Sequence, residues 1–348
     1  MLSLIGESLV PIFGPFRLLT SHIFLAGLAI VLSGSLTWIF LPRFAPILPT
    51  DRGRAYAIGK EAALGKPTSA GSVFVLIYAL IAFLTVPWNF SHFSILGIII
   101  LAMICGVIDD RGNGLSEYWL ALIDFGIALL ASFVLFSNPL MEIWLPFITD
   151  TVMVPRWICL PCSTGLLWIA INATNCTDGV DGLSGSLSVI ALCTLGGLLY
   201  FVLGHDEISS YLLLPHYPDG AGWAISAFTM VGCLVGYLWF NAHPSILLMG
   251  DAGSRSVGLL LGILVIKSGN PFLLLIVSSV LLVNGGTGLV KVSLLRFFKI
   301  KILHNIRFPL HDHVRHNLGW SNNQVLVRFT LLQVIIVLVF TIVLIKFR

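Results

Sequence analysis

The stretch IIILAMICGVIDD, residues 98–110, joins a long apolar run directly to a pair of acids. Similar runs fill the chain, since 57% of its 348 residues are hydrophobic and only 10% are charged. A soluble domain usually has about a quarter of its residues charged. The mean hydropathy of +0.98 and the net charge of only +3 therefore exclude a soluble globular protein, a disordered chain and a nucleic-acid binder. We predict a helical protein that crosses a membrane many times.

Ten apolar stretches approach the roughly 20 residues that a helix needs to cross a hydrocarbon core about 30 Å thick. The predicted fold class is an all-α polytopic integral membrane protein with about ten transmembrane helices, forming a single domain over residues 1–348. Residues 1–17, which include Pro11 and Pro15, are expected to lie at the membrane interface. The predicted spans are about 20–41, 70–88, 92–108, 118–137, 157–173, 183–204, 222–240, 254–268, 270–290 and 325–346.

The distribution of basic residues predicts the orientation of these spans. Ten spans place both termini on one side, and the connections 42–69, 109–117, 174–182, 241–253 and 291–324 on the other. With the flanking residues Arg255 and Arg328, the second side holds 14 of the 19 lysines and arginines. Cytoplasmic loops are enriched in these residues. We therefore expect these connections to be cytoplasmic and both termini to be extracytoplasmic.

Acids, amides and histidines collect in the same connections. Because separate connections carry these residues on one side of the membrane, we predict one composite site at the cytoplasmic boundary. The polar clusters are DD at 109–110, NATNCTDGVDG at 172–182, NAHP at 241–244, MGDAGS at 249–254 and PLHDH at 309–313.

The acidic clusters suggest a divalent cation. Asp109 and Asp110 end an apolar run, and two adjacent carboxylates there need a cation, a proton or a substrate group to offset their repulsion. Asp251 lies between Gly250 and Gly253, which keep its carboxylate uncrowded. Magnesium is usually held by one or two carboxylates together with substrate phosphates and waters. The sequence therefore predicts Mg²⁺ at Asp251.

The remaining clusters suggest a phosphorylated substrate. Asn172, Asn175, Asp178 and Asp181 repeat every three residues, which would place them along one face of a helix. The long connection 291–324 is basic, and two histidines in its PLHDH motif suit a pyrophosphate or a sugar-phosphate. Taken together, the clusters favour phosphoryl transfer between a soluble and a lipid substrate.

These motifs also reveal a family resemblance. The chain resembles the polyprenyl-phosphate N-acetylhexosamine-1-phosphate transferases, most closely the branch that acts on phospho-MurNAc-pentapeptide. The matching strings are GVIDD at 106–110, NATNCTDGVDGL at 172–183, NAHP at 241–244, MGDAGS at 249–254, PLHDH at 309–313 and GWSNNQVLVRF at 319–329. The resemblance implies transfer of phospho-MurNAc-pentapeptide from UDP-MurNAc-pentapeptide to undecaprenyl phosphate, with Mg²⁺ and release of UMP. This would be the first membrane step of peptidoglycan synthesis, at the cytoplasmic face of the bacterial inner membrane.

The resemblance also implies roles for individual residues. Asp251 would hold the metal, and Asp109 and Asp110 would lie beside the lipid phosphate as the other catalytic acids. His311 and His313 would face the sugar-phosphate, and Lys66 and Arg111 would bind substrate. The nucleotide and phosphate pocket would be lined by Asn172, Asn175, Asp178, Asp181 and Asn241. A homodimer is a further expectation that the sequence leaves open.

The chain departs from the family pattern at several places. Asp312 stands where the middle histidine of a PxHHH motif is usual, and Leu248 stands where an aromatic residue would stack on uracil. Two lysines that usually follow the double acid are missing, so Arg111 is the expected replacement. The string KPTSAG at 66–71 replaces TPTMGG.

Two alternative functions remain at this stage. A sister transferase would load GlcNAc-1-phosphate or another hexosamine-1-phosphate onto the same lipid. An ion-coupled transporter is the more remote alternative, and Asp124, which lies inside a predicted span, is the residue that fits it.

Overall fold

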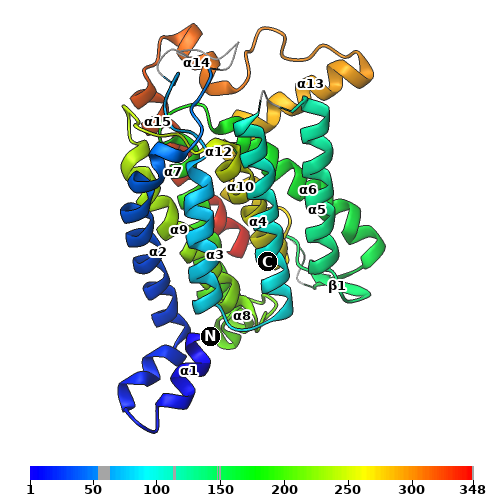
Figure 1. Cartoon of the computed structure of the whole chain (residues 1–348). Coiled ribbons are helices and arrows are strands. Elements are labelled where there is room, and N and C mark those ends of the chain that lie inside the picture. Colours follow the sequence, from blue (N-terminus) through cyan, green and yellow to red (C-terminus); the bar gives the residue numbers. More distant parts are fainter. Residues whose placement is uncertain (54–62, 113–114, 147, 149, 347–348) are drawn as a thin grey trace.

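The computed structural model describes residues 1–53, 63–112, 115–146, 148 and 150–346. They form a bundle of long helices with one small hairpin (Figure 1). The long helices are α2 (His22–Phe44), α3 (Ala70–Thr85), α4 (Phe90–Arg111), α5 (Glu117–Leu135), α6 (Arg156–Thr177), α7 (Leu183–Gly197), α9 (Gly220–Asn241), α10 (Gly250–Lys267), α13 (Thr287–Phe298) and α15 (Asn322–Lys346). The shorter elements are α1 (Leu2–Leu9), η1 (Gly14–Thr20), η2 (Ala45–Ile47), η4 (Leu198–Leu203), α8 (Asp206–Tyr211), α11 (Leu273–Val277), α12 (Ser279–Leu281), η5 (Leu282–Gly286) and α14 (Leu310–Leu318).

The predicted multi-pass helical membrane protein is confirmed in its general form. Within the described residues, 8 helices are long and apolar enough to cross a membrane. Two further predicted spans correspond to α3, an apolar helix of 16 residues, and to α10, which carries three charged side chains. The number of ten spans and the side on which the termini lie stay predictions.

Helix α10 is the centre of the bundle. Every residue from Asp251 to Val265 is buried, and the helix packs against α3, α4, α6, α7 and α9. After Arg255 this stretch is apolar or small on all sides, which is typical of a buried helix. Gly106 of α4 allows a close approach, because a Cβ at this position would lie 2.4 Å from the backbone nitrogen of Ala252. The end of α4 and the start of α10, where the conspicuous acids lie, are therefore packed together.

One predicted span is shifted along the chain, because the candidate span that overlaps it is Ser279–Phe298. The stretch 270–290 is not a continuous helix, because α11 ends at Val277, α12 starts at Ser279 and a π-helical segment follows. The side chain of Gln333, from α15, is fully buried against this break. Its Nε2 donates to the Val277 carbonyl at 2.6 Å, and its Oε1 accepts from the Val280 N–H at 2.9 Å. The glutamine amide thus satisfies backbone groups that water cannot reach, which makes the break possible in an apolar setting.

The structure also contains a short β-hairpin, which the all-helical prediction lacked. Strands β1 (Leu140–Ile143) and β2 (Val152–Pro155) pair antiparallel, with Leu140 opposite Pro155. Trp144, which is fully buried, donates from Nε1 to the Ser268 carbonyl at 2.7 Å and so fixes the hairpin beside the end of α10. In Figure 1 the hairpin and α1 lie at the opposite end of the bundle from α13 and α14.

Candidate functional site

Asp110 is held at the start of α10. Its carboxylate accepts hydrogen bonds from the backbone N–H groups of Asp251 at 3.0 Å and Ala252 at 3.3 Å. The hydroxyl of Ser69 donates to the same carboxylate. Unpaired N–H groups and the helix dipole make a helix N-terminus favourable for a negative charge. Asp110 therefore joins α4, α3 and α10 at one point.

Asp109 points toward Asp251. One of its carboxylate oxygens accepts from the Leu115 N–H at 2.6 Å, and its carboxyl group lies within hydrogen-bonding contact of the Asp251 carboxyl group. Two carboxyl groups this close need a proton or a cation between them. The contact between Asp109 and Asp251 is consequently the part of the site that best suits a metal ion.

A buried arginine completes the acidic cluster. Arg255, one turn after Asp251, directs Nη2 at 2.9 Å and Nε at 3.3 Å to Oδ2 of Asp251. Its Nη1 donates to both carboxylate oxygens of Asp124, which comes from α5. The sequence suggested Arg255 as a flanking basic residue, whereas the structure buries it inside the bundle.

The segment 66–71 lies along the segment before α10. The Leu248 N–H donates to the Pro67 carbonyl at 2.8 Å, and the Gly71 N–H donates to the Met249 carbonyl at 2.9 Å. This pairing places Lys66 within 3.0 Å of the Ser245 hydroxyl. It also explains why Ser69 reaches Asp110. The predicted substrate-binding residue Lys66 therefore lies beside the segment that leads into α10, in contact with Ser245.

The predicted helical register after Asn172 is only half right. Asn172 and Asn175 lie on α6, and Asn175 donates to the Ser254 hydroxyl of α10 at 3.0 Å. Asn172 donates to its own helix at the Trp168 carbonyl. However, α6 ends at Thr177, so Asp178 and Asp181 do not continue the face. The glycines that follow these two acids favour a turn over further helix.

Asp181 nevertheless returns to the site through that turn. It accepts hydrogen bonds from the Ser245 hydroxyl at 2.7 Å and from His243 Nδ1 at 2.8 Å. Partial burial raises the pKa of Asp181. The hydrogen bonds from Ser245 and His243 together lower the pKa by more than burial raises it, so the pKa lies below its ordinary value. The carboxylate is therefore charged at neutral pH, next to Lys66.

Asn241 links two of the motifs. Its Oδ1 accepts from the Gly182 N–H at 2.8 Å, and its Nδ2 donates to the Leu247 carbonyl at 2.9 Å. The side chain is buried, so both bonds are shielded from water. Asn241 thus holds the turn after α6 against the segment that leads into α10.

His311 is fixed against the same turn. It is only 2% exposed, and its backbone N–H donates to Asn284 Oδ1 at 2.8 Å. This bond orients the amide of Asn284, so that its Nδ2 donates to His311 Nδ1 at 3.1 Å. The proton of the neutral imidazole is then on Nε2. That nitrogen faces the turn, since a Cβ on Gly179 would lie 2.6 Å from it.

Two predicted residues lie further out. His313 is two positions after His311 on α14. Two residues correspond to a rotation of about 200° around the helix axis, so the two side chains point to nearly opposite sides of the helix. His313 Nδ1 accepts from the Arg307 N–H at 3.3 Å, away from the contacts of His311. Arg111 is exposed at the end of α4, and its backbone carbonyl accepts from Arg52. The structure does not bring either side chain to the acidic cluster, and their roles stay predictions.

The acidic cluster offers two neighbouring carboxyl groups, Asp109 and Asp251, to a metal ion. No group of three or more histidine, cysteine or acidic side chains in the described part of the chain is arranged to hold an ion. Magnesium does not require such a cage, because one or two carboxylates and substrate phosphates suffice. The pair formed by Asp109 and Asp251 fits that requirement.

The family model described as glycosyl transferase family 4 matches residues 92–269. The chain belongs to this family. The match runs from α4 to the end of α10 and so includes the acidic cluster.

Within glycosyl transferase family 4, the chain is similar to proteins named phospho-N-acetylmuramoyl-pentapeptide-transferase. It is 48% identical over 325 residues to that of Treponema pallidum (strain Nichols), covering 92% of this chain and 90% of that protein. It is 30% identical over 322 residues to that of Wolinella succinogenes, covering 88% and 90%. It is 29% identical over 332 residues to that of Campylobacter lari, covering 89% and 91%. The resemblance stated from the motifs is confirmed.

Several residues of this family member were not predicted as part of the site. Ser69, Ser245 and Asn284 each contact a predicted site residue. Ser69 and Ser245 lie in or next to quoted motifs, so the strings KPTSAG and NAHP carried a usable signal. Asn284 lies in an apolar stretch with no motif, and only the fold brings it to His311.

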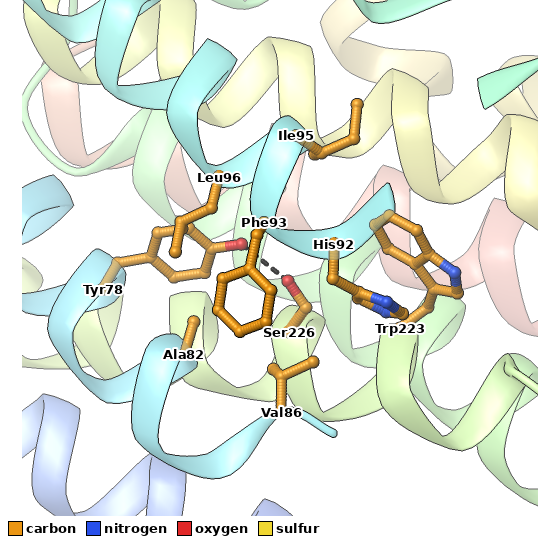
Figure 2. A pocket seen from close by; sticks show the side chains of 9 residues that line it. All are labelled: Tyr78, Ala82, Val86, His92, Phe93, Ile95, Leu96, Trp223 and Ser226. Atoms are coloured by element: carbon orange, nitrogen blue, oxygen red, sulfur yellow. Dashed lines mark hydrogen bonds between the residues drawn. The ribbon is translucent and has the colours of Figure 1, made fainter. Parts of the chain in front are cut away.

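A small cavity lies at the other end of the bundle (Figure 2). It has a volume of about 10 Å³, enough for one water molecule. Among the described residues, neither ring nitrogen of His92 has a hydrogen-bond partner, and the ring stacks on Trp223 at 3.8 Å. Tyr78 and Ser226 share a hydrogen bond of 2.6 Å beside it. His92 lies near the start of α4, whereas Asp109 lies near the end of the same helix. The cavity is therefore separate from the acidic cluster.

Proposed function

We propose that this family-4 member transfers phospho-MurNAc-pentapeptide from its UDP carrier to undecaprenyl phosphate and releases UMP. The observation that supports this most directly is the meeting of α3, α4, α6 and α10 around Asp110 and Asp251. Asn175 contacts the same helix through Ser254, and Asn241 and His311 both pack against the turn after α6. The names of the relatives favour the MurNAc-pentapeptide substrate over the GlcNAc-1-phosphate alternative.

The reaction exchanges one phosphoanhydride linkage for another. An oxygen of the lipid phosphate attacks the phosphorus that carries the sugar, and the bond from this phosphorus to the UMP oxygen breaks. A diphosphate lipid forms and UMP leaves. Because the reacting groups are all anionic, catalysis consists mainly of positioning and of neutralising charge.

The residues of the site divide this work. Asp251 and Asp109 would hold Mg²⁺, which would neutralise charge on the phosphates. Asp110 fixes the start of α10 and so places Asp251. Nε2–H of His311 and the ammonium group of Lys66 would donate hydrogen bonds to the sugar-phosphate or to the nucleotide phosphates. Asn175 at the end of α6, and Asp178 and Asp181 in the turn after it, would contact the nucleotide or its phosphates.

The proposed placement in the membrane follows the charge pattern. Counting α3 and α10 with the 8 candidate spans gives ten crossings, with both termini extracytoplasmic. The acidic cluster and α14 are then at the cytoplasmic face of the bacterial inner membrane. The excess of lysine and arginine in the connections on that side supports this orientation. The homodimer stays a prediction.

The test is release of UMP by purified protein in detergent, with UDP-MurNAc-pentapeptide and undecaprenyl phosphate. Asp251→Asn should abolish Mg²⁺-dependent release without unfolding the protein. Asp206→Asn, which alters an exposed acid at the start of α8, serves as the control and should retain activity. Release from UDP-GlcNAc but not from UDP-MurNAc-pentapeptide would replace the proposed function by the sister reaction. Unchanged turnover in Asp251→Asn would refute the metal assignment.

A further inference from the structure

Arg255 lies in a buried chain of charges beneath the proposed metal site. The exposed fraction is 3% for Arg255, 1% for Asp124 and 6% for Asp251. The guanidinium group bridges the two acids, with Nη1 on Asp124 and with Nη2 and Nε on Oδ2 of Asp251. The three residues come from α5 and α10, and Asp124 is 131 positions from Arg255 in the sequence.

Such an arrangement is costly. Each buried charge loses its hydration, and apolar side chains of similar volume usually stabilise a core as well as or better than a buried ion pair. Ionisable side chains inside a membrane bundle usually have a functional role for the same reason. The position of this group, one turn from the acid that would hold Mg²⁺, indicates what the role is.

The geometry points to Arg255 as a positioning residue for Asp251. Both of its contacts with Asp251 fall on the same oxygen, Oδ2, so they fix the rotation of the carboxyl group. In that rotation the group contacts Asp109. Asp124 holds the guanidinium from the other side. We propose that Asp124 and Arg255 together set the affinity of the Asp109 and Asp251 pair for a divalent cation.

This inference rests on the proposed function for its metal site, and it also accounts for one departure from the family pattern. The lysines that usually follow the double acid are missing, and the expected replacement, Arg111, is exposed at the end of α4. Arg255 instead supplies a buried cation next to the acids. Because its guanidinium nitrogens are already bonded to Asp124 and Asp251, it acts through Asp251 and not by binding substrate itself.

The test measures the binding of Mn²⁺, as a substitute for Mg²⁺, by electron paramagnetic resonance of purified protein in detergent. The variant is Asp124→Leu combined with Arg255→Leu, which removes both partners and leaves no newly unpaired charge. Loss of a residue that orients a metal ligand typically lowers metal affinity about 10- to 100-fold. We expect a Kd for Mn²⁺ that is higher by this factor. The Mg²⁺ concentration needed for half-maximal UMP release should rise similarly, and kcat at saturating Mg²⁺ should recover.

Arg255→Lys tests the geometry separately from the charge. Lysine retains a cation but cannot make the paired contacts of a guanidinium group. It should bind Mn²⁺ more weakly than the wild type, although its charge is unchanged. A Kd equal to that of the wild type in Arg255→Lys would contradict the positioning role.

The control is the ion pair at the other end of α10. Lys267 Nζ lies 3.3 Å from Asp219 Oδ2, and replacing both by Asp219→Asn and Lys267→Met should lower thermal stability without changing the Kd for Mn²⁺. If the double leucine variant is folded and binds Mn²⁺ within twofold of the wild type, the inference is wrong. It is also wrong if Asp251→Asn does not weaken Mn²⁺ binding. Absence of UMP release by the wild type would refute the proposed function alone, because the Mn²⁺ comparison does not depend on turnover.

Discussion

Gly179 offers a sharp test of the role of His311. In Gly179→Ala the new methyl group would lie 2.6 Å from Nε2 and 3.0 Å from Cε1 of the imidazole. Ordinary contact begins at 3.4 Å, so the ring would have to move by about 0.8 Å. The ring is buried and its Nδ1 accepts a hydrogen bond from Asn284 Nδ2, so this movement breaks or strains that bond.

The expected cost follows from this geometry. Overpacking of this kind typically destabilises a fold by about 1–3 kcal/mol. Misplacement of a substrate-contacting group by about 1 Å can lower activity by about 100-fold. We therefore expect kcat/KM for UMP release to fall about 10- to 100-fold in Gly179→Ala, with a lower Tm in detergent. Gly165→Ala is the matched control, because a Cβ at Gly165 in α6 meets nothing within 4 Å.

A double-mutant cycle shows whether the effect passes through His311. If the methyl group acts by displacing the imidazole, Gly179→Ala should change activity less than about threefold in a His311→Ala background. Full additivity of the two losses would refute this reasoning. Wild-type kcat/KM in the Gly179→Ala single variant would refute it as well.

Three further predictions concern other parts of the fold. Gln333→Leu should destabilise the protein by about 2–3 kcal/mol in thermal unfolding, because the backbone groups at the break after α11 lose their partners. The control is Thr330→Val on the same helix, which should change the stability little because the Thr330 hydroxyl has no partner within the described chain. The lowered pKa of Asp181 means that its hydrogen bonds contribute fully above its ordinary pKa of 3.8 and are lost as the pH falls through the lowered value. The Tm difference between wild type and Asp181→Asn should therefore be constant from pH 5 to 8 and shrink only in stronger acid; a difference that vanishes near pH 6 would contradict this. His92→Phe should keep the stacking on Trp223, remove two nitrogens that lack partners in the described residues, raise the Tm and leave UMP release unchanged; a lower Tm would show that the imidazole is needed.

Long apolar runs made the helices predictable from the sequence. A run such as 98–110 has few alternatives to a buried or membrane-spanning helix, and α4 ends at Arg111 as the acids suggested. The break after Val277 was not predictable, because the sequence there is apolar on both sides. It depends on Gln333, which lies more than fifty residues further along the chain.

In the candidate site, too, the motifs could be predicted from the sequence, whereas the contacts between distant residues could not. The motifs containing Asp110, Asp181 and Asp251 were visible in the sequence, and the structure brings them to one end of the bundle. The contacts that orient them were not visible. Asp124 appeared as the residue best suited to a transporter, but its charge is paired with Arg255. Such a pairing depends on how α5 packs beside α10, which no local pattern records.

The most direct test of the account is the position of the metal. Crystals grown with Mn²⁺ in place of Mg²⁺, together with UMP, would locate the ion by its anomalous scattering. The account predicts one peak between the carboxyl groups of Asp109 and Asp251, next to the nucleotide phosphate. A peak elsewhere, or a well-ordered site with no peak between these two acids, would contradict it.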